Sequence, residues 1–145
     1  MNFVEYLYEI KGVKPNFPDK FGEWLGYQID SYDREKGLVT TTLHLTDSHL
    51  SPSQAVHGGV ISAFLDFTCG CAVFAVINRD QLCSTVELNV KYFKPLRKGD
   101  DIVAQAKILH HGNTLCSAMA SLYLADNLEK PLAMATGTFN LYHLK

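Results

Sequence analysis

Hydrophobic and polar positions alternate with different periods along the chain, and one stretch hardly alternates at all. Between Gly58 and Asn78 the only charged side chain is Asp66, and almost every other residue is apolar or small. An apolar segment of this length without a polar face is typical of a helix that is covered on nearly every side. The pattern therefore predicts one long buried helix, ending near Asn78, with a carboxylate near its middle.

After this helix the period of the pattern changes to two, which indicates strands. The side chains of residues 85–93 alternate between two faces of a strand. One face carries Val86, Leu88, Val90 and Tyr92, and the other carries Glu87, Asn89 and Lys91. Three further strands are predicted over residues 101–109, 114–124 and 132–142, with turn-forming residues between them.

Before the apolar helix, residues 2–10 predict a short amphipathic helix, and Pro15 and Pro18 predict a loop. Two strands are predicted over residues 22–33 and 38–46. This order of elements has no β-α-β alternation, so we expect an α+β fold in which a curved, mostly antiparallel sheet wraps around one long central helix. The length of 145 residues suits a single domain, 1–145.

Composition and charge narrow the possible functions. The net charge is −2, which argues against a nucleic-acid partner, because such proteins normally present a basic face. We expect no secretory signal, since the first residues lack a basic segment and include Glu5 and Glu9. Four cysteines without the spacing of a zinc site indicate free thiols in a reducing, cytoplasmic environment, with no metal and no cofactor: Cys69, Cys71, Cys83 and Cys116.

The apolar helix is also long enough to cross a bilayer. An aspartate at the centre of a spanning helix costs about 2.5 to 3.5 kcal/mol, however, and no positively charged flank sets an orientation here. We therefore expect the helix to be buried inside a folded domain, with no membrane insertion.

Several motifs together resemble those of one family. His57-Gly58-Gly59 opens the apolar helix, and Asp66 follows nine residues after the histidine. Downstream lie a Pro-x-x-x-Gly-Asp turn within residues 84–100, a hairpin at 108–115 and the sequence Ala-Met-Ala-Thr-Gly-Thr-Phe at 133–139. Over about residues 40–142 the chain resembles the hotdog-fold acyl-CoA thioesterases, in particular the phenylacetate-pathway (PaaI-like) group.

The resemblance implies hydrolysis of an acyl-CoA, with coenzyme A as part of the substrate, by a homodimer or a dimer of dimers (a homotetramer). It implies Asp66 as the catalytic carboxylate and the Gly58 N–H as the donor to the thioester carbonyl. Thr85 falls where some relatives carry Ser or Thr near the attacking water. Relatives often carry Asn six residues before the histidine, whereas this chain has Ser51.

Elementary chemistry points to the same two groups. Thioester hydrolysis needs an attacking group or an activated water, and a donor for the developing oxyanion. The Asp66 carboxylate can serve the first need, as nucleophile or as general base. The first amides of a helix lack intrahelical acceptors, so the Gly58 N–H can serve the second, and glycines at 58 and 59 let a substrate approach the backbone.

The spacing of these groups predicts an oligomer. Gly58 and Asp66 are eight residues apart, which places them about 12 Å apart along one helix. Both must lie within about 3 to 3.5 Å of one thioester. Two antiparallel helices from two chains satisfy this requirement, so we infer a two-fold dimer with two composite sites.

Alternatives remain for most of these residues. Asp66 could be a structural buried carboxylate, and His57 could cap the helix or shape the site. Phe64 and Phe67 could line an acyl pocket or only pack the core. A basic set could attract the phosphates of coenzyme A or could form an ordinary solvated surface: Lys91, Lys94, Arg97 and Lys98.

Two other functions compete with thioester hydrolysis. A hotdog dehydratase or isomerase usually relies on a histidine in a different place, and the carboxylate nine residues after His57 disfavours this interpretation. A non-hydrolytic acyl-CoA-binding module is the other alternative, and only an activity measurement separates it from an enzyme.

Overall fold

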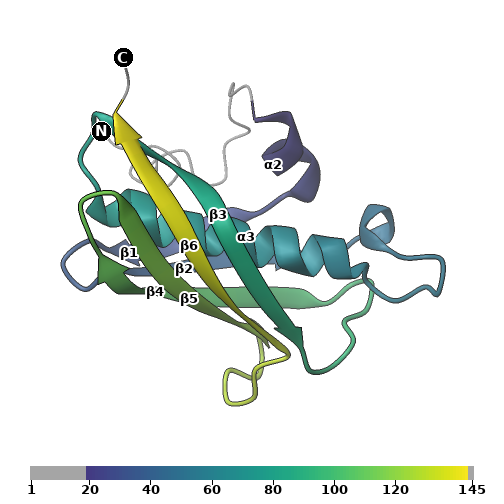
Figure 1. The fold of residues 1–145 in the computed structure, drawn as a ribbon. Helices are drawn as coiled ribbons and strands as arrows, with labels where there is room; N and C mark the ends of the chain where they lie inside the picture. Colours follow the sequence, from purple (N-terminus) through teal and green to yellow (C-terminus); the bar gives the residue numbers. More distant parts are fainter. Residues whose placement is uncertain (1–18, 144–145) are drawn as a thin grey trace.

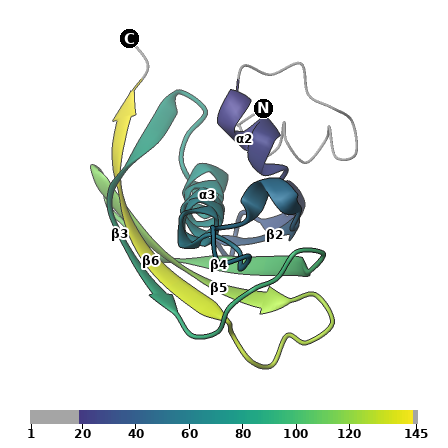
Figure 2. The same cartoon turned by 90° about the vertical axis from the view of Figure 1, so that its right-hand side faces the viewer.

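One curved antiparallel sheet wraps around one long helix in the computed structural model, which describes residues 19–143 (Figures 1 and 2). The strands follow the order β1-β2-β4-β5-β6-β3, and every neighbouring pair is antiparallel. This confirms the predicted α+β architecture, whereas the helix expected at 2–10 and the loop at Pro15 and Pro18 lie outside the described residues. The strands are β1 (Gln28–Asp33), β2 (Leu38–His44), β3 (Gln81–Tyr92), β4 (Asp101–His111), β5 (Leu115–Leu124) and β6 (Ala133–His143).

The central helix α3 (Gly58–Val76) is buried along most of its length. Phe64 and Leu65 are completely buried against the inner face of the sheet, where Leu122 and Phe139 are also buried. Burial of each such side chain contributes about 1.5 to 3 kcal/mol, so α3 anchors the core. By length and composition this helix could cross a membrane, but here 61% of its apolar window is buried within the protein.

One side of α3 is not covered by the sheet. In Figure 2 the strands lie to the left of, below and to the right of α3, and none of the described strands lies above it. Half-buried residues recur along the helix at three- to four-residue spacing, which places them on one face: Ser62, Ala63, Asp66, Phe67, Gly70 and Phe74. Asp66 is therefore a carboxylate on the one face of an apolar helix that the sheet leaves partly open.

The prediction of a strand over residues 22–33 is wrong for the first half of that range. Helix α2 (Lys20–Leu25) occupies this position, and β1 begins only at Gln28. The side chain of Asp19 caps the helix start by accepting from the Gly22 N–H at 2.8 Å, and Gly26 ends the helix with a left-handed φ of 84°. These capping residues favour a short helix where the apolar pattern alone resembled a strand. The polar loop after β2 likewise contains a short 3₁₀ helix, Asp47–His49.

The predicted alternation of β3 is interrupted by a β-bulge. Thr85 pairs with Phe139 and Glu87 pairs with Thr138, so Val86 has no partner and is the extra residue. Leu88 and Val90 are half-buried on the core side, as predicted, but Val86 is 62% exposed and the prediction for it is wrong. A bulge shifts the two-residue alternation by one position. Odd-numbered side chains such as Thr85 therefore face the core before the bulge, and even-numbered ones such as Leu88 and Val90 face it afterwards.

Candidate functional site

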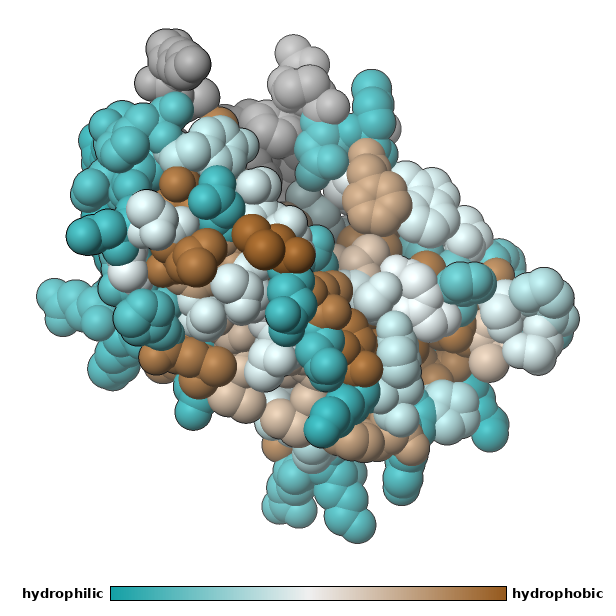
Figure 3. All heavy atoms as spheres, in the orientation of Figure 1, coloured by the Kyte–Doolittle hydropathy of each residue, from teal (hydrophilic) through white to brown (hydrophobic). Residues whose placement is uncertain are grey.

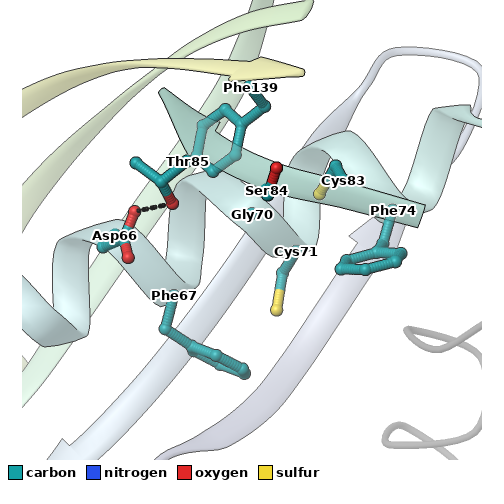
Figure 4. Close-up of a pocket in the computed structure, with 9 residues that line it drawn as sticks. All are labelled: Asp66, Phe67, Gly70, Cys71, Phe74, Cys83, Ser84, Thr85 and Phe139. Atoms are coloured by element: carbon teal, nitrogen blue, oxygen red, sulfur yellow. Dashed lines mark hydrogen bonds between the residues drawn. The ribbon is translucent and has the colours of Figure 1, made fainter. Parts of the chain in front are cut away.

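The bulge in β3 brings a hydroxyl to the carboxylate of α3. Because Thr85 pairs with the buried Phe139, its side chain points to the inner face of the sheet, where an unbroken alternation would have placed Val86. The Thr85 hydroxyl donates a hydrogen bond to Oδ1 of Asp66, with an oxygen–oxygen distance of 2.8 Å (Figure 4). The structure therefore brings together two of the site residues that the sequence indicated.

The environment of Asp66 makes its carboxylate a stronger base than an exposed aspartate. Burial raises the pKa of Asp66, and the hydrogen bond from Thr85 lowers it in part. The other oxygen of Asp66, Oδ2, has no protein partner among residues 19–143. A free, basic oxygen suits either attack on a carbonyl or activation of a water molecule.

A cavity of about 170 Å³ lies beside Asp66, between α3 and β3 (Figure 4). Its wall is mostly apolar and is made of Asp66, Phe67, Gly70, Cys71, Phe74, Cys83, Ser84, Thr85 and Phe139. A dry cavity of about 150 Å³ can hold a benzene molecule, so this one has room for a small acyl or aryl group. Of the two phenylalanines considered from the sequence, Phe67 lines this cavity, whereas Phe64 lies in the core with no exposed surface.

The cysteines near this cavity are not nucleophiles. Burial raises the pKa of Cys83 to about 12, and burial also raises the pKa of Cys71 well above that of an ordinary thiol. The reactive form of cysteine is the thiolate, and at neutral pH both thiols are protonated. All four cysteines are free, and Cys71 and Cys83 serve as neutral, polarisable parts of the cavity wall.

The start of α3 is a second polar region. His57 is the N-cap, and its Nδ1 accepts a hydrogen bond from the Gly59 N–H at 2.8 Å. The His57 N–H in turn donates to the carbonyl of His49 at 2.8 Å, which ties the preceding loop to the helix. A Cβ on residue 59 would lie 2.9 Å from this Nδ1, so the position needs glycine for as long as His57 caps the helix. Capping is thus the role of His57 that the geometry supports directly.

The Gly58 amide is the free donor at this helix start. No acceptor lies within hydrogen-bonding distance of its N–H among residues 19–143. Its carbonyl, in contrast, accepts a hydrogen bond from the Tyr92 hydroxyl at 3.1 Å. An unpaired amide at the positive end of a helix dipole is suited to bind a negatively charged oxygen. Tyr92 was not singled out from the sequence, where its alternation indicated only that it faces the core side of β3.

Ser51 lies at the Gly58 end of α3, in a tight loop that precedes the helix. Its N–H donates to the carbonyl of Ala55 at 2.7 Å, and its hydroxyl contacts that of Ser53 at 2.7 Å. Gln54, in the same loop, has a positive φ of 67°, which is uncommon outside glycine. The Ser51 hydroxyl is therefore engaged within its own loop and makes no hydrogen bond to Asp66.

The basic residues lie apart from the cavity beside Asp66. Lys91, Lys94 and Arg97 are all exposed, and Lys98 forms an ion pair with Asp47 at 2.7 Å. Lys94 also contributes, with Lys130, to a separate cavity of about 240 Å³ between the β3–β4 and β5–β6 loops. Within residues 19–143, no three His, Cys, Asp or Glu side chains are grouped so that they could hold a metal ion.

One chain does not bring its two candidate groups to one point. Gly58 and Asp66 lie on the same straight helix, about 12 Å apart along its axis. The start of α3 offers a main-chain donor, and the middle offers a carboxylate beside an apolar cavity. These two groups therefore lie at separate places on one chain.

The family of the chain follows from comparison with known proteins. Residues 53–129, more than half of the chain, match the model of the thioesterase superfamily, so the chain belongs to that superfamily. The medium/long-chain acyl-CoA thioesterase YigI of Escherichia coli is 26% identical over 132 residues, which cover 82% of this chain and 83% of that protein. Human acyl-coenzyme A thioesterase 13 is 27% identical over 86 residues, which cover 59% of this chain and 61% of that protein.

Solved structures agree with this assignment. The phenylacetic acid degradation-related protein of Ralstonia eutropha superposes with a TM-score of 0.81 at 27% identity, covering 96% of this chain and 99% of that protein. The fold is therefore the hotdog thioesterase fold, and the expected resemblance to PaaI-like thioesterases is confirmed.

Proposed function

We propose that the chain is an acyl-CoA thioesterase that cleaves the thioester to a free acid and coenzyme A. The observation that carries this proposal is the half-buried Asp66, with its raised pKa, at the mouth of an apolar cavity between α3 and β3. Membership of the thioesterase superfamily and the names of its relatives support the same reaction class.

In the proposed reaction the acyl group lies in the cavity and its carbonyl carbon lies next to Asp66. The free oxygen of Asp66 either attacks this carbon or removes a proton from an attacking water. In the first case a mixed anhydride forms between the acyl group and Asp66, the carbon–sulfur bond breaks and the thiolate of coenzyme A leaves, and water then hydrolyses the anhydride to the free acid and the Asp66 carboxylate. In the second case the water oxygen bonds to the carbonyl carbon, the carbon–sulfur bond breaks, and the proton passes from Asp66 to the departing thiolate. Thr85 holds the carboxylate in place through its other oxygen.

The donor to the carbonyl oxygen comes, in this proposal, from Gly58 of a second copy of the chain. The distance of about 12 Å along α3 excludes the Gly58 of the same chain. Two features favour such pairing: the face of α3 that the sheet leaves partly open, which carries Ala63 and Gly70, and the neighbouring strand β3, which is an edge of the sheet that the described residues form. An antiparallel dimer, alone or as half of a homotetramer, would cover both and complete two sites.

Other residues serve the remainder of the substrate in this scheme. The exposed cations Lys91, Lys94 and Arg97 lie at the end of β3 and in the loop after it, where they can attract the phosphates of coenzyme A. Gly59 follows Gly58 in the helix, and Ser51 belongs to the loop that leads into the same end of α3. The free thiols suit a reducing compartment such as the cytoplasm.

The proposal is tested by measuring release of free coenzyme A from a panel of acyl- and aryl-CoA substrates. Asp66→Asn keeps the shape of the side chain but removes its basicity, so we expect kcat to fall at least a hundredfold. Asp126→Asn, in the exposed turn after β5, is the matched control and should hydrolyse as the wild type does.

The outcomes separate the competing functions. Binding of acyl-CoA without release of coenzyme A by the wild type would identify a binding module, and a modified acyl-CoA product with an intact thioester would identify a dehydratase or isomerase. In single-turnover hydrolysis in ¹⁸O-labelled water, label found in Asp66 identifies the nucleophilic route, because general-base catalysis forms no bond between Asp66 and the water oxygen.

A further inference from the structure

The first peptide groups of α3 are held from two sides, and one of the contacts comes from a distant strand. The Tyr92 hydroxyl, at the end of β3, donates to the carbonyl oxygen of Gly58 at 3.1 Å. Its ring also lies against the same residue, since a Cβ on Gly58 would be 3.6 Å from the ring carbon Cε1. Tyr92 thus donates to the carbonyl of the residue that offers the free amide, and its ring borders the space that a side chain on that residue would take.

The Gly58–Gly59 peptide plane is fixed at both of its polar atoms. Its oxygen accepts from Tyr92, and its N–H, which belongs to Gly59, donates to Nδ1 of His57 at 2.8 Å. In the preceding peptide, the His57 carbonyl accepts from the Val60 N–H at 2.9 Å. The peptides on both sides of the Gly58 α-carbon are therefore hydrogen-bonded, and these bonds set the direction of the free Gly58 N–H.

Glycine makes such restraint necessary. Two successive glycines have the least restricted backbone of any residue pair, and without side chains they cannot be held by packing of their own. The contact from Tyr92 is the restraint on this peptide that comes from outside the helix and its cap. Removing it would leave the Gly58–Gly59 peptide restrained by the helix and by its hydrogen bond to His57, without any contact from the sheet.

We propose that Tyr92 is a positioning residue, which orients the Gly58 amide toward the oxyanion that forms on the substrate. The inference rests on the proposed thioesterase function. An oxyanion donor acts only if it is aimed at the position the oxygen takes in the transition state, so a loosely held amide loses part of its effect. Tyr92 itself touches neither the substrate nor the reacting atoms in this scheme.

The first test is Tyr92→Phe, which removes the hydroxyl and keeps the ring against Gly58. We expect kcat to fall roughly five- to tenfold, a fraction of the hundred- to thousandfold effect of losing an oxyanion donor outright. KM and the acidic limb of the pH profile should not change, because the substrate contacts and Asp66 are untouched. Tyr142→Phe, an exposed tyrosine on β6 with no hydrogen bond from its hydroxyl within the described part of the chain, is the control. A raised KM with unchanged kcat, or no change at all, overturns the proposal.

The second test asks whether Tyr92 acts through Gly58. Gly58→Pro removes the amide hydrogen, so Tyr92→Phe should have no further effect on kcat in that background. If the two residues acted independently, the double variant would show the combined loss of both single variants. A mixed dimer of Tyr92→Phe and Asp66→Asn chains adds a geometric check. The one intact Asp66, on the Tyr92→Phe chain, would face the unaltered Gly58 and Tyr92 of the Asp66→Asn chain, so that site should turn over at the wild-type rate. A rate per intact site equal to that of the Tyr92→Phe homodimer contradicts the proposal.

A third measurement does not depend on activity. Hydrogen exchange of the Gly59 amide, followed by NMR, should become severalfold faster in Tyr92→Phe and stay the same in Tyr142→Phe. Unchanged exchange overturns the positioning role. An inactive wild type would instead overturn the thioesterase proposal, and the exchange result would still report on the contact between Tyr92 and Gly58.

Discussion

The start and the middle of α3 are built in opposite ways. At the start, the group proposed to act on the substrate is a main-chain amide, and two side chains hold the peptide next to it: the imidazole of His57 and the hydroxyl of Tyr92. In the middle, the proposed group is the side chain of Asp66, and an irregularity of the main chain, the bulge at Val86, lets the Thr85 hydroxyl bond to it. The two regions lie on one helix but depend on different parts of β3.

This difference predicts which substitutions remove the proposed activity of each region. A side-chain carboxylate is removed by ordinary substitution, whereas a backbone donor survives most substitutions and is lost only when its hydrogen is removed. The neighbouring residues also matter differently, since those at the start affect the direction of a donor and those in the middle affect the protonation of a base. Substitutions at each place can therefore be chosen to separate the two effects.

The largest effect is expected from Gly58→Pro. Proline is well tolerated at the first position of a helix, and His57 has φ −63° and ψ 134°, which suits a residue before proline. The fold should therefore persist while the amide hydrogen is lost, and we expect kcat to fall roughly a hundred- to a thousandfold. Steady-state kinetics together with the melting temperature check this outcome.

Gly58→Ala is the matched control for the proline variant. Its Cβ would lie 3.6 Å from the Tyr92 ring, an ordinary contact, and its N–H remains. We expect it to stay within a few fold of the wild type. If the alanine and proline variants are equally active, the start of α3 does not contribute its amide to the reaction.

A smaller effect, roughly tenfold on kcat, is expected from Thr85→Val in the middle of α3. The lost hydrogen bond is the interaction that lowers the pKa of Asp66, so this pKa should rise further. Since hydrolysis needs ionised Asp66, activity disappears as the pH falls through this pKa, and in the variant the loss should begin at a higher pH. The pH dependence of kcat/KM measures the shift, and Thr85→Ser should restore the wild-type profile. A fall in kcat without any movement of the acidic limb would contradict this role of Thr85.

The smallest effect on the overall rate is expected from Gly70→Val, which changes substrate preference through the cavity beside the middle of α3. A Cβ at Gly70 would lie 3.7 Å from the ring of Phe139, so alanine fits there and valine extends into the cavity. We expect the ratio of kcat/KM for the bulkiest good substrate to kcat/KM for acetyl-CoA to fall roughly tenfold. This is the effect expected when one or two methylene groups of the acyl chain lose their place in a pocket. A uniform loss across all acyl groups would mean that the acyl group lies elsewhere, and Gly70→Ala controls for the added Cβ.

The fold and half of the candidate site could be predicted from the sequence because they depend on period and on local spacing. The uninterrupted apolar run predicted α3, and its one carboxylate and opening glycines stood out against it. The α2 region was misassigned because capping by Asp19 and Gly26 outweighs the apolar pattern there. The position of Thr85 depends on one extra residue in a strand pairing, which no count of alternating residues can reveal.

Tyr92 was missed for a different reason. Its role depends on a contact between residues 34 positions apart in the chain, and a tyrosine at the end of an alternating strand resembles any other half-exposed aromatic residue. Further apolar side chains of the strands are exposed, such as Val86 and Leu115. On the face shown in Figure 3, hydrophobic residues are interspersed with hydrophilic ones. An exposed aromatic or aliphatic residue is therefore no signal of function by itself.

The two glycines that open α3 are separate constraints, and a selection for active variants would tell them apart. At position 59 the limit is the imidazole of His57, whose Nδ1 lies 2.9 Å from the place that a Cβ would take, so larger residues should be recovered only together with a small residue at 57. At position 58 there is room for a side chain, and the residue to be excluded is proline. A library randomised at 57, 58 and 59 should thus show covariation between the first and third positions, and independence of the second from both.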